Sequence, residues 1–265
     1  MPFDAILALT DCSPRGLQAV MRAASLAQHR RCLLKIMYAP AEPQCAVDAQ
    51  AWRETSRRVA ADIHARLGVL VKNVADTRGH LDAVAEEARW VDLLVVGPGW
   101  DSPDGSLLGG LRVERLQRVV PCPVLLARLE ATSGYRRVLV AIDSAPDAAA
   151  LLHLARSIGH GAGAVPLHAT APTMMAPWRD RIRRARVRAA RRPAPAGAMH
   201  ERAVADGLPR RAHAQLTVVG RRRRSSSLRD AVCQSAARQV LRRSGGDVLL
   251  VPHDLRLEAG LPPAD

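Results

Sequence analysis

Short apolar runs alternate with amphipathic segments along this chain, and the pattern is clearest from Val91 to Ala127. There an apolar run, Leu93 to Val96, stops at Gly97, and a polar loop, an amphipathic segment and a second apolar run from Val124 follow it. The order strand, loop, helix, strand is typical of the crossover unit of a parallel sheet. Because ligands of such sheets bind beyond the carboxyl ends of the strands, the loop after Gly97 is the predicted binding edge.

The same order returns near the C-terminus, so the chain contains an internal repeat. A strand from Gln215 to Val219 is followed by Gly220, a polar loop, a helix from Leu228 to Leu241 and a strand from Val248 to Val251. A chain of 265 residues is long enough for two domains, and the repeat favours two over one. The predicted organisation is a first domain at 1–130, a linker at 131–135, a second domain at 136–255 and a C-terminal tail at 256–265.

Strand and helix alternate through both halves, which predicts two tandem doubly wound α/β domains, each with a five-stranded parallel sheet. In the first half Ser13 is a typical N-cap and Pro14 a typical first helical residue. The strands predicted there are Ala5–Thr10, Cys32–Tyr38, Val69–Val74, Leu93–Val96 and the run from Val124 to Ala127, and the predicted helices end near Gln28, Leu67 and Arg89.

The second half repeats this order less regularly. A strand from Arg137 to Ile142 leads through Asp143 into a helix that ends near Ile158. The next predicted strand, Val165 to Ala169, contains Pro166, which suits the edge of a sheet better than its centre. The third strand, at 199–203, and the helix at 207–213 are weak in the sequence, so the repeat is kept best at both ends of the domain.

Net charge separates the two halves. Residues 1–133 carry 16 Lys plus Arg against 15 Asp plus Glu, whereas residues 134–265 carry 23 against 10. Eight arginines between 179 and 192 would hold nucleic-acid phosphates in a salt-sensitive, sequence-independent way. The alternative is an amphipathic helix that buries Trp178 and Ile182 while its arginines stay in solvent. The lack of interleaved aromatic residues and of a DNA-reading module favours the amphipathic helix.

Composition and spacing weigh against several function classes. The sequence has no run of 18 or more apolar residues and no basic, apolar and cleavable leader at its N-terminus, so we expect a cytoplasmic protein without a membrane span. The five cysteines and nine histidines show no metal-ligand spacing, and no serine lies in a nucleophile elbow. We therefore expect neither a metal site nor catalysis. Cys12 lies between a strand and a helix N-terminus, where a thiol pKa can be lowered, but a buried, inert thiol is the commoner case and is favoured.

Two kinds of segment resemble those of a known family. The first is Ile6-Leu-Ala-Leu-Thr-Asp11-Cys-Ser13-Pro14, which returns as Val138-Leu-Val-Ala-Ile-Asp143-Ser-Ala-Pro146. The second is Val91 to Ala127, with the helix-to-strand turn Val119-Val-Pro121-Cys122-Pro123-Val-Leu-Leu, and it returns as Thr217 to Val251. In these segments the chain resembles the universal stress protein family in its tandem form, and the resemblance covers the chain except residues 170–200.

The resemblance implies a fold and a mode of association. The fold is the adenine nucleotide alpha hydrolase-like fold of universal stress proteins, carried twice. The mode of association is pairing of the final strands of two domains, here Val124 to Ala127 and Val248 to Val251. Such pairing would cover an exposed sheet edge.

Family members that hold ATP share a loop of the form Gly, two residues, Gly, nine residues, Gly, then Ser or Thr. Its glycines let backbone N–H groups approach the phosphates, and its hydroxyl adds a hydrogen bond. In the first half the corresponding residues are Gly97, Trp100, Gly110 and Leu111, so the second glycine and the hydroxyl are replaced. The resemblance therefore implies that the first domain does not hold ATP, and Trp100 is expected to fill the emptied cleft.

In the second half the loop keeps the first glycine of the pattern but not the others. It keeps Gly220 but has Arg223 at the second glycine, and one extra residue brings Ser235 to the position of the hydroxyl. The run Arg221–Arg224 with Ser225 and Ser226 nevertheless suits a phosphate or polyanion, because guanidinium groups and hydroxyls both bind such oxygens. The alternative is a solvated run of arginines.

The acid at the end of the first strand of each domain, Asp11 or Asp143, has two interpretations. In the family such an acid helps to fix the nucleoside. Equally, a polar residue at a strand end helps to cap the next helix. Capping is favoured for Asp11, whereas both interpretations stay open for Asp143.

Three functions from different classes follow from these residues. The first is a non-enzymatic bacterial tandem universal stress protein that does not bind ATP in the usual way and acts through protein interaction or anion sensing. The second is a nucleotide-binding stress protein that uses the second-domain site. The third is a nucleic-acid or polyanion binder that uses the arginine-rich second half.

Overall fold

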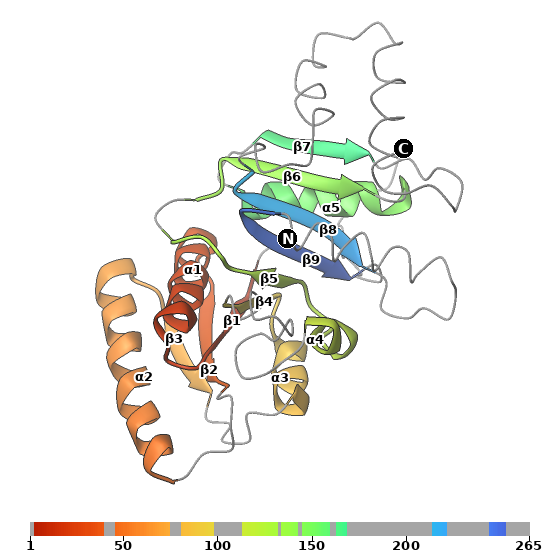
Figure 1. Ribbon diagram of the computed structural model, residues 1–265. Helices are drawn as coiled ribbons and strands as arrows, with labels where there is room; N and C mark the ends of the chain where they lie inside the picture. Colours follow the sequence, from red (N-terminus) through yellow and green to blue (C-terminus); the bar gives the residue numbers. More distant parts are fainter. Residues whose placement is uncertain are drawn as a thin grey trace, which may run out of the picture. The chain divides into compact units, whose positions relative to one another are not determined.

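The computed structural model describes residues 3–39, 46–74, 81–97, 113–131, 134–142, 145–159, 163–168, 214–221 and 244–252 (Figure 1). The chain divides into two compact units, and the division falls between Gly134 and Tyr135. The predicted domain limits at 130, 136 and 255 stay predictions. Within the ranges given above, no helix is both long enough and apolar enough to pass through a lipid bilayer.

The first unit alternates strands and helices in the predicted order. Its strands pair in the order β3-β2-β1-β4-β5, and every pair is parallel. Helices α1 and α2 pack together on one face of the sheet, whereas α3 and α4 pack together on the other (Figure 1). This architecture confirms a doubly wound parallel sheet. The elements are β1 (Ala5–Thr10), α1 (Pro14–Arg30), β2 (Leu33–Tyr38), α2 (Ala46–Leu67), β3 (Val71–Val74), α3 (Leu81–Glu87), the 3₁₀ helix η1 (Ala88–Trp90), β4 (Leu93–Val96), α4 (Val113–Val119) and β5 (Val124–Leu126).

The core of the first unit lies along its central strands. Every residue of β1, β4 and β5 is buried, because helices cover both faces of the sheet. Helix α1 begins where the sequence predicts: Ser13 Oγ accepts the Gly16 backbone N–H at 3.0 Å, and Pro14 is the first helical residue. It ends at Arg31, a left-handed residue whose N–H donates to the Ala27 and Gln28 carbonyls.

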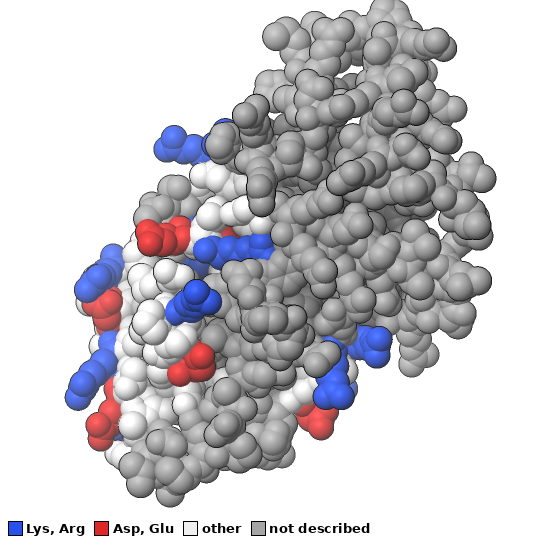
Figure 2. Space-filling model, in the orientation of Figure 1, with Lys and Arg blue, Asp and Glu red and all other residues white. Residues whose placement is uncertain are grey.

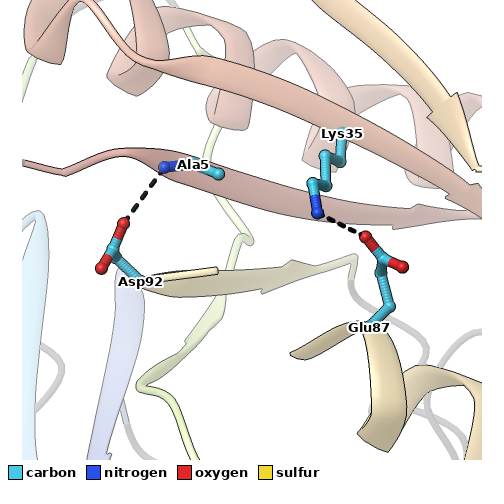
Figure 3. Close-up of polar contacts among 4 residues, drawn as sticks. All are labelled: Ala5, Lys35, Glu87 and Asp92. Carbon is cyan, nitrogen blue, oxygen red and sulfur yellow. Dashed lines mark hydrogen bonds and ion pairs between the residues drawn. The ribbon is translucent and has the colours of Figure 1, made fainter. Parts of the chain in front are cut away.

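Two polar contacts join β1 and β2 to the elements beside them (Figure 3). Asp92, just before β4, accepts through Oδ2 the backbone N–H groups of Asp4 at 2.7 Å and Ala5 at 3.1 Å. Lys35 of β2 forms an ion pair with Glu87, the last residue of α3, with 2.5 Å between Nζ and Oε1. The two side chains of the ion pair are only 11% and 23% exposed, so α3 is tied to the sheet by a largely buried contact.

The second unit has four described strands in the order β9-β8-β6-β7, again all parallel. Helix α5 packs against β6, β7 and β8. Pro166 lies in β7, at one end of this row of four strands, and the predicted place of the proline at a sheet edge or strand end stays a prediction. The expected fifth strand at 199–203, the arginine-rich segment at 179–192 and the helix at 228–241 lie outside the described residues. The elements are β6 (Arg137–Ile142), α5 (Ala145–Ile158), β7 (Gly163–His168), β8 (Leu216–Arg221) and β9 (Asp247–Pro252).

The strand registers align the two units residue by residue. In the first unit Leu7 pairs with Leu94, which pairs with Val124; in the second, Leu139 pairs with Thr217, which pairs with Val248. Counting from these pairs, Asp11 corresponds to Asp143, Gly97 to Gly220 and Asp92 to Gln215. Gln215 indeed repeats the contact made by Asp92, because its Oε1 accepts the backbone N–H groups of Arg136 at 2.6 Å and Arg137 at 3.2 Å.

Several predicted boundaries were wrong. The strand predicted to begin at Val69 begins at Val71, and the strand predicted at Val248 to Val251 runs from Asp247 to Pro252. The helix predicted to run from Leu81 to Arg89 ends as an α-helix at Glu87, and its last turn is the 3₁₀ helix η1. The strand predicted to begin at Val165 begins at Gly163, opposite Arg137. The strand predicted to stop at Val219 continues through Gly220 and Arg221, because β9 extends to Pro252 and supplies both residues with partners.

Candidate functional site

The predicted site of the first unit lies where β1 and β4 end. These strands are parallel neighbours, so Asp11, which follows β1, and Gly97, which follows β4, lie at the same edge of the sheet. Gly97 is buried and Asp11 is partly buried. The structure therefore brings these two predicted residues to one edge. Gly110, Trp100 and Leu111 lie outside the described residues.

In the turn from β1 into α1, side-chain oxygens accept backbone N–H groups of the same turn. Thr10 Oγ1 accepts the Cys12 backbone N–H at 3.1 Å, and Asp11 Oδ1 accepts that of Ser13 at 2.9 Å. A Cβ atom built at Gly16 would lie 2.5 Å from Asp11 Oδ1 and 2.8 Å from Thr10 Oγ1, so both side chains lie directly against the first turn of the helix. Of the two interpretations of Asp11, this geometry supports helix capping.

Cys12 lies in the same turn with a left-handed backbone, at a φ of 63°. Burial raises the pKa of its thiol to about 11, and the neighbouring Asp11 carboxylate adds to the rise. Of the two interpretations of Cys12, the raised pKa supports the buried, inert thiol. The nearby helix N-terminus favours a thiolate, but loss of water and a like charge outweigh it.

Cys12 is expected to react slowly with alkylating agents in the folded protein. The thiolate is the reactive form, and a pKa of about 11 instead of 9.0 makes it roughly 100-fold scarcer at pH 8. Iodoacetamide labelling, followed by peptide mass spectrometry, should therefore give a Cys12 rate at least about 100-fold below that of the urea-unfolded chain. The native rate should keep rising up to about pH 11. A native rate that levels off near pH 8 would contradict the raised pKa.

An aromatic pair that sequence reasoning missed lies at the same edge. Tyr38, the last residue of β2, stacks on Trp52 of α2 with 4.8 Å between ring centroids and 16° between the ring planes. The next residue, Ala39, donates its backbone N–H to the Thr10 carbonyl at 2.9 Å. This hydrogen bond joins the residue after β2 to the last residue of β1. Trp52 could be placed on one side of its helix from the sequence, but nothing in the sequence pairs it with Tyr38.

In the second unit Gly220 is part of β8 and not of a loop. It pairs with Val251, and Arg221 pairs with Pro252, so the arginine run begins within the strand. A Cβ atom at Gly220 would lie 3.4 Å from Leu151 Cδ1 of α5, which is ordinary van der Waals contact, so the packing of α5 on β8 does not require a glycine there. The other predicted residues of this site, Asp143, Arg223, Ser225, Ser226 and Ser235, lie outside the described residues.

The described surface of the first unit carries charges of both signs (Figure 2). In the space-filling view basic and acidic side chains alternate along the α2 side of the first unit and do not form a single basic patch (Figure 2). Exposed Arg66, for example, pairs with Asp62 at 2.7 Å. Within this part of the chain, no group of three His, Cys, Asp or Glu side chains has the arrangement of a metal site.

Comparison with known proteins identifies the fold. Neither a protein-family model nor a curated protein matches the sequence. A solved structure of a universal stress protein from Archaeoglobus fulgidus DSM 4304 is 17% identical with a TM-score of 0.60, and the match covers 94% of this chain and 98% of that one. A functionally unknown protein from Pseudomonas aeruginosa PAO1 is 20% identical with a TM-score of 0.59, over 94% and 92% of the two chains. Strand order, parallel registers and a match along nearly the whole chain agree: this chain has the universal stress protein fold in its tandem, two-domain form.

Proposed function

We propose that this protein is a universal stress protein that acts without catalysis, does not hold ATP in the manner of the family, and serves a stress response by binding other proteins. The observation that carries the proposal is the position of the Asp11 carboxylate, whose Oδ1 accepts the Ser13 backbone N–H at 2.9 Å. The family resemblance assigns this acid to the nucleoside. In this chain one of its two oxygens, Oδ1, is engaged by the Ser13 backbone N–H at the start of α1.

Two substitutions in the loop after β4 support the same conclusion. Trp100 stands where the family loop has its second glycine, and Leu111 stands where it has a hydroxyl. A bulky side chain at the first position keeps backbone N–H groups away from phosphates, and leucine cannot replace the lost hydrogen bond. Triphosphate binding in the first unit would therefore lack both its backbone cradle and its hydroxyl.

Exposed apolar side chains favour a protein partner. Trp90 is 70% exposed and Leu70 is 67% exposed, and both lie shortly before strands, toward the edge of the sheet opposite the nucleotide edge. Exposed tryptophan is enriched where proteins bind one another. Self-association through the final strands, Val124 to Ala127 and Val248 to Val251, is the partner interaction that the family resemblance favours.

Phosphate or polyanion capture by Arg221–Arg224 is the second candidate. Strand β8 ends at Arg221, so the arginine run begins at the carboxyl end of a parallel strand. Ligands of parallel sheets bind at that edge, which favours this candidate. Nucleotide binding by the second domain stays the remaining alternative. A cytoplasmic location stays a prediction.

The melting temperature of the wild-type chain is expected not to change with millimolar ATP and Mg²⁺. The double variant Trp100→Gly/Leu111→Ser restores the family pattern in the first loop and is expected to melt higher with ATP. A ligand at 100 times its dissociation constant adds about 2.7 kcal/mol to the stability of the folded state. Differential scanning fluorimetry with and without ATP measures both.

The matched control is Trp100→Gly/Leu111→Ala, which opens the loop without supplying the hydroxyl and should gain less. Stabilisation of the wild-type chain by ATP would overturn the proposal. Failure of both double variants to respond would show that Trp100 and Leu111 are not the cause of the lost binding.

A further inference from the structure

The end of the first unit is held by a buried arginine. Arg22 of α1 is only 3% exposed, and its Nη2 donates to the carbonyl oxygens of Glu130 at 2.7 Å and Leu129 at 3.4 Å. Both carbonyls follow β5, where the chain leaves the unit. By the alignment of Pro14 with Pro146, the residue equivalent to Arg22 in the second unit is Leu154, which is 4% exposed. The first unit thus buries a charge where its repeat buries a leucine.

The start of the second unit is held by a buried tyrosine and carboxylate. The hydroxyl of Tyr135 donates to Asp247 Oδ2 at 2.5 Å, and the two residues are 1% and 0% exposed. The strand registers make Phe3 equivalent to Tyr135 and Pro123 equivalent to Asp247. The first unit therefore has no counterpart of this hydrogen bond, and Phe3 there packs under the guanidinium of Arg30 at 5.4 Å.

These exceptions to the repeat flank the same segment of the sequence, residues 131–134. Burying a charge or a carboxylate is unfavourable unless it is well partnered, and an apolar residue is accepted at each equivalent position. The polar replacements therefore need a reason specific to one copy. Arg22 binds the last residues before 131–134, and Tyr135 is the first residue after them. The end of the first unit and the start of the second both adjoin the joining segment. The equivalent places in the other copy of the repeat do not.

We propose that Arg22 and the Tyr135–Asp247 pair form a junction clamp, which fixes the backbone on each side of residues 131–134. Within the first unit Arg22 holds the Glu130 carbonyl, and within the second unit Asp247 holds the Tyr135 hydroxyl. Gln215 holds the next two backbone N–H groups. The joining segment is then limited to four residues. A protease cuts beside it only after one side of the clamp has opened.

The test is native-state proteolysis at the two clamped positions. Glutamyl endopeptidase cuts after Glu130, whose carbonyl is the group that Arg22 holds, and chymotrypsin cuts after Tyr135. The variants exchange each clamp residue for its counterpart in the repeat: Arg22→Leu and Tyr135→Phe, the second of which keeps the chymotrypsin site. Cleavage that depends on local opening follows the population of the open form. Loss of a hydrogen bond to a charged group should raise that population about tenfold.

Intact-mass analysis is expected to show cleavage after Glu130 about tenfold faster in Arg22→Leu, and cleavage after residue 135 about tenfold faster in Tyr135→Phe. Arg22→Lys, which keeps one donor, should lie between Arg22→Leu and the wild type. The control is Ile63→Ala, which destabilises the buried face of α2 away from the junction. Rates within twofold of the wild type, or a rise that matches the loss of melting temperature in Ile63→Ala, would overturn the clamp. Should Arg22→Leu not fold, Arg22→Lys and Tyr135→Phe decide between these outcomes.

Discussion

Replacement of Gly246 by alanine is expected to lower the free energy of unfolding of the second unit by about 3 kcal/mol. Gly246 immediately precedes β9 and lies against the backbone that precedes β8. An added Cβ would overlap the Ala214 carbonyl oxygen and would lie 2.7 Å from that of Gln215. Both are backbone atoms next to a paired strand, so they cannot move aside as a flexible side chain would.

The neighbouring Gly245 supplies a matched control. A Cβ added there has no atom within 4 Å, so Gly245→Ala should be neutral or slightly stabilising. Urea denaturation followed by circular dichroism measures both variants. Equal midpoints for Gly246→Ala and Gly245→Ala would contradict this close approach. The backbone just before β8 would then lie farther from Gly246 than it does in the structure.

Removal of the Glu87 carboxylate is expected to destabilise the first unit by about 2 kcal/mol. Glu87→Ala leaves the Lys35 ammonium, which is only 11% exposed, without the partner that now lies 2.5 Å away. Breaking a fully buried ion pair from one side costs about 3–5 kcal/mol, and the partial exposure of Glu87 reduces that figure. Urea denaturation of the variant measures the loss.

The double variant Lys35→Met/Glu87→Ala shows why Glu87→Ala is less stable. The cause is either the unpaired charge left on Lys35 or the loss of packing around residue 87. Because it removes both charges, it should recover most of the stability that Glu87→Ala loses. Lys72→Met changes the exposed lysine directly opposite Lys35 on β3 and should have little effect. If the double variant is as unstable as the sum of the two single variants, the charges contribute independently and the ion pair is not the cause.

The fold was predictable because apolar periodicity, helix capping and the internal repeat all indicate the same architecture. The apolar runs that became β1, β4 and β6 were predicted with the bounds that the structure has, since buried parallel strands are apolar on both faces. Ser13 and Pro14 marked the start of α1 because the chemistry of a helix N-terminus is local. The internal repeat then fixed the order of the second unit.

What escaped prediction depends on partners distant in sequence. Gly220 was read as the start of a loop because glycine commonly ends a strand, but β9 continues beside it to Pro252. The buried, inert thiol was favoured for Cys12, but the burial that raises its pKa is seen only in the structure. Burial is a property of the whole fold and cannot be read from a single segment.

The candidate site was predicted in part. The position of Asp11 just after β1 follows from local sequence, and in the structure its Oδ1 accepts the backbone N–H of the N-cap residue Ser13. The Tyr38–Trp52 stack beside it required knowledge of how α2 returns onto β2, which spacing alone does not supply. The loop residues from Trp100 to Leu111, and those from Arg223 to Ser235, stay predictions of the sequence.

Asp92 and Gln215 make the same two hydrogen bonds with different side chains, one a carboxylate and the other an amide. An acceptor oxygen is all that these two hydrogen bonds require, and a carboxylate and an amide both supply one. The first strand of each unit is therefore fixed at its start by the same pair of backbone contacts, whichever of the two side chains makes them.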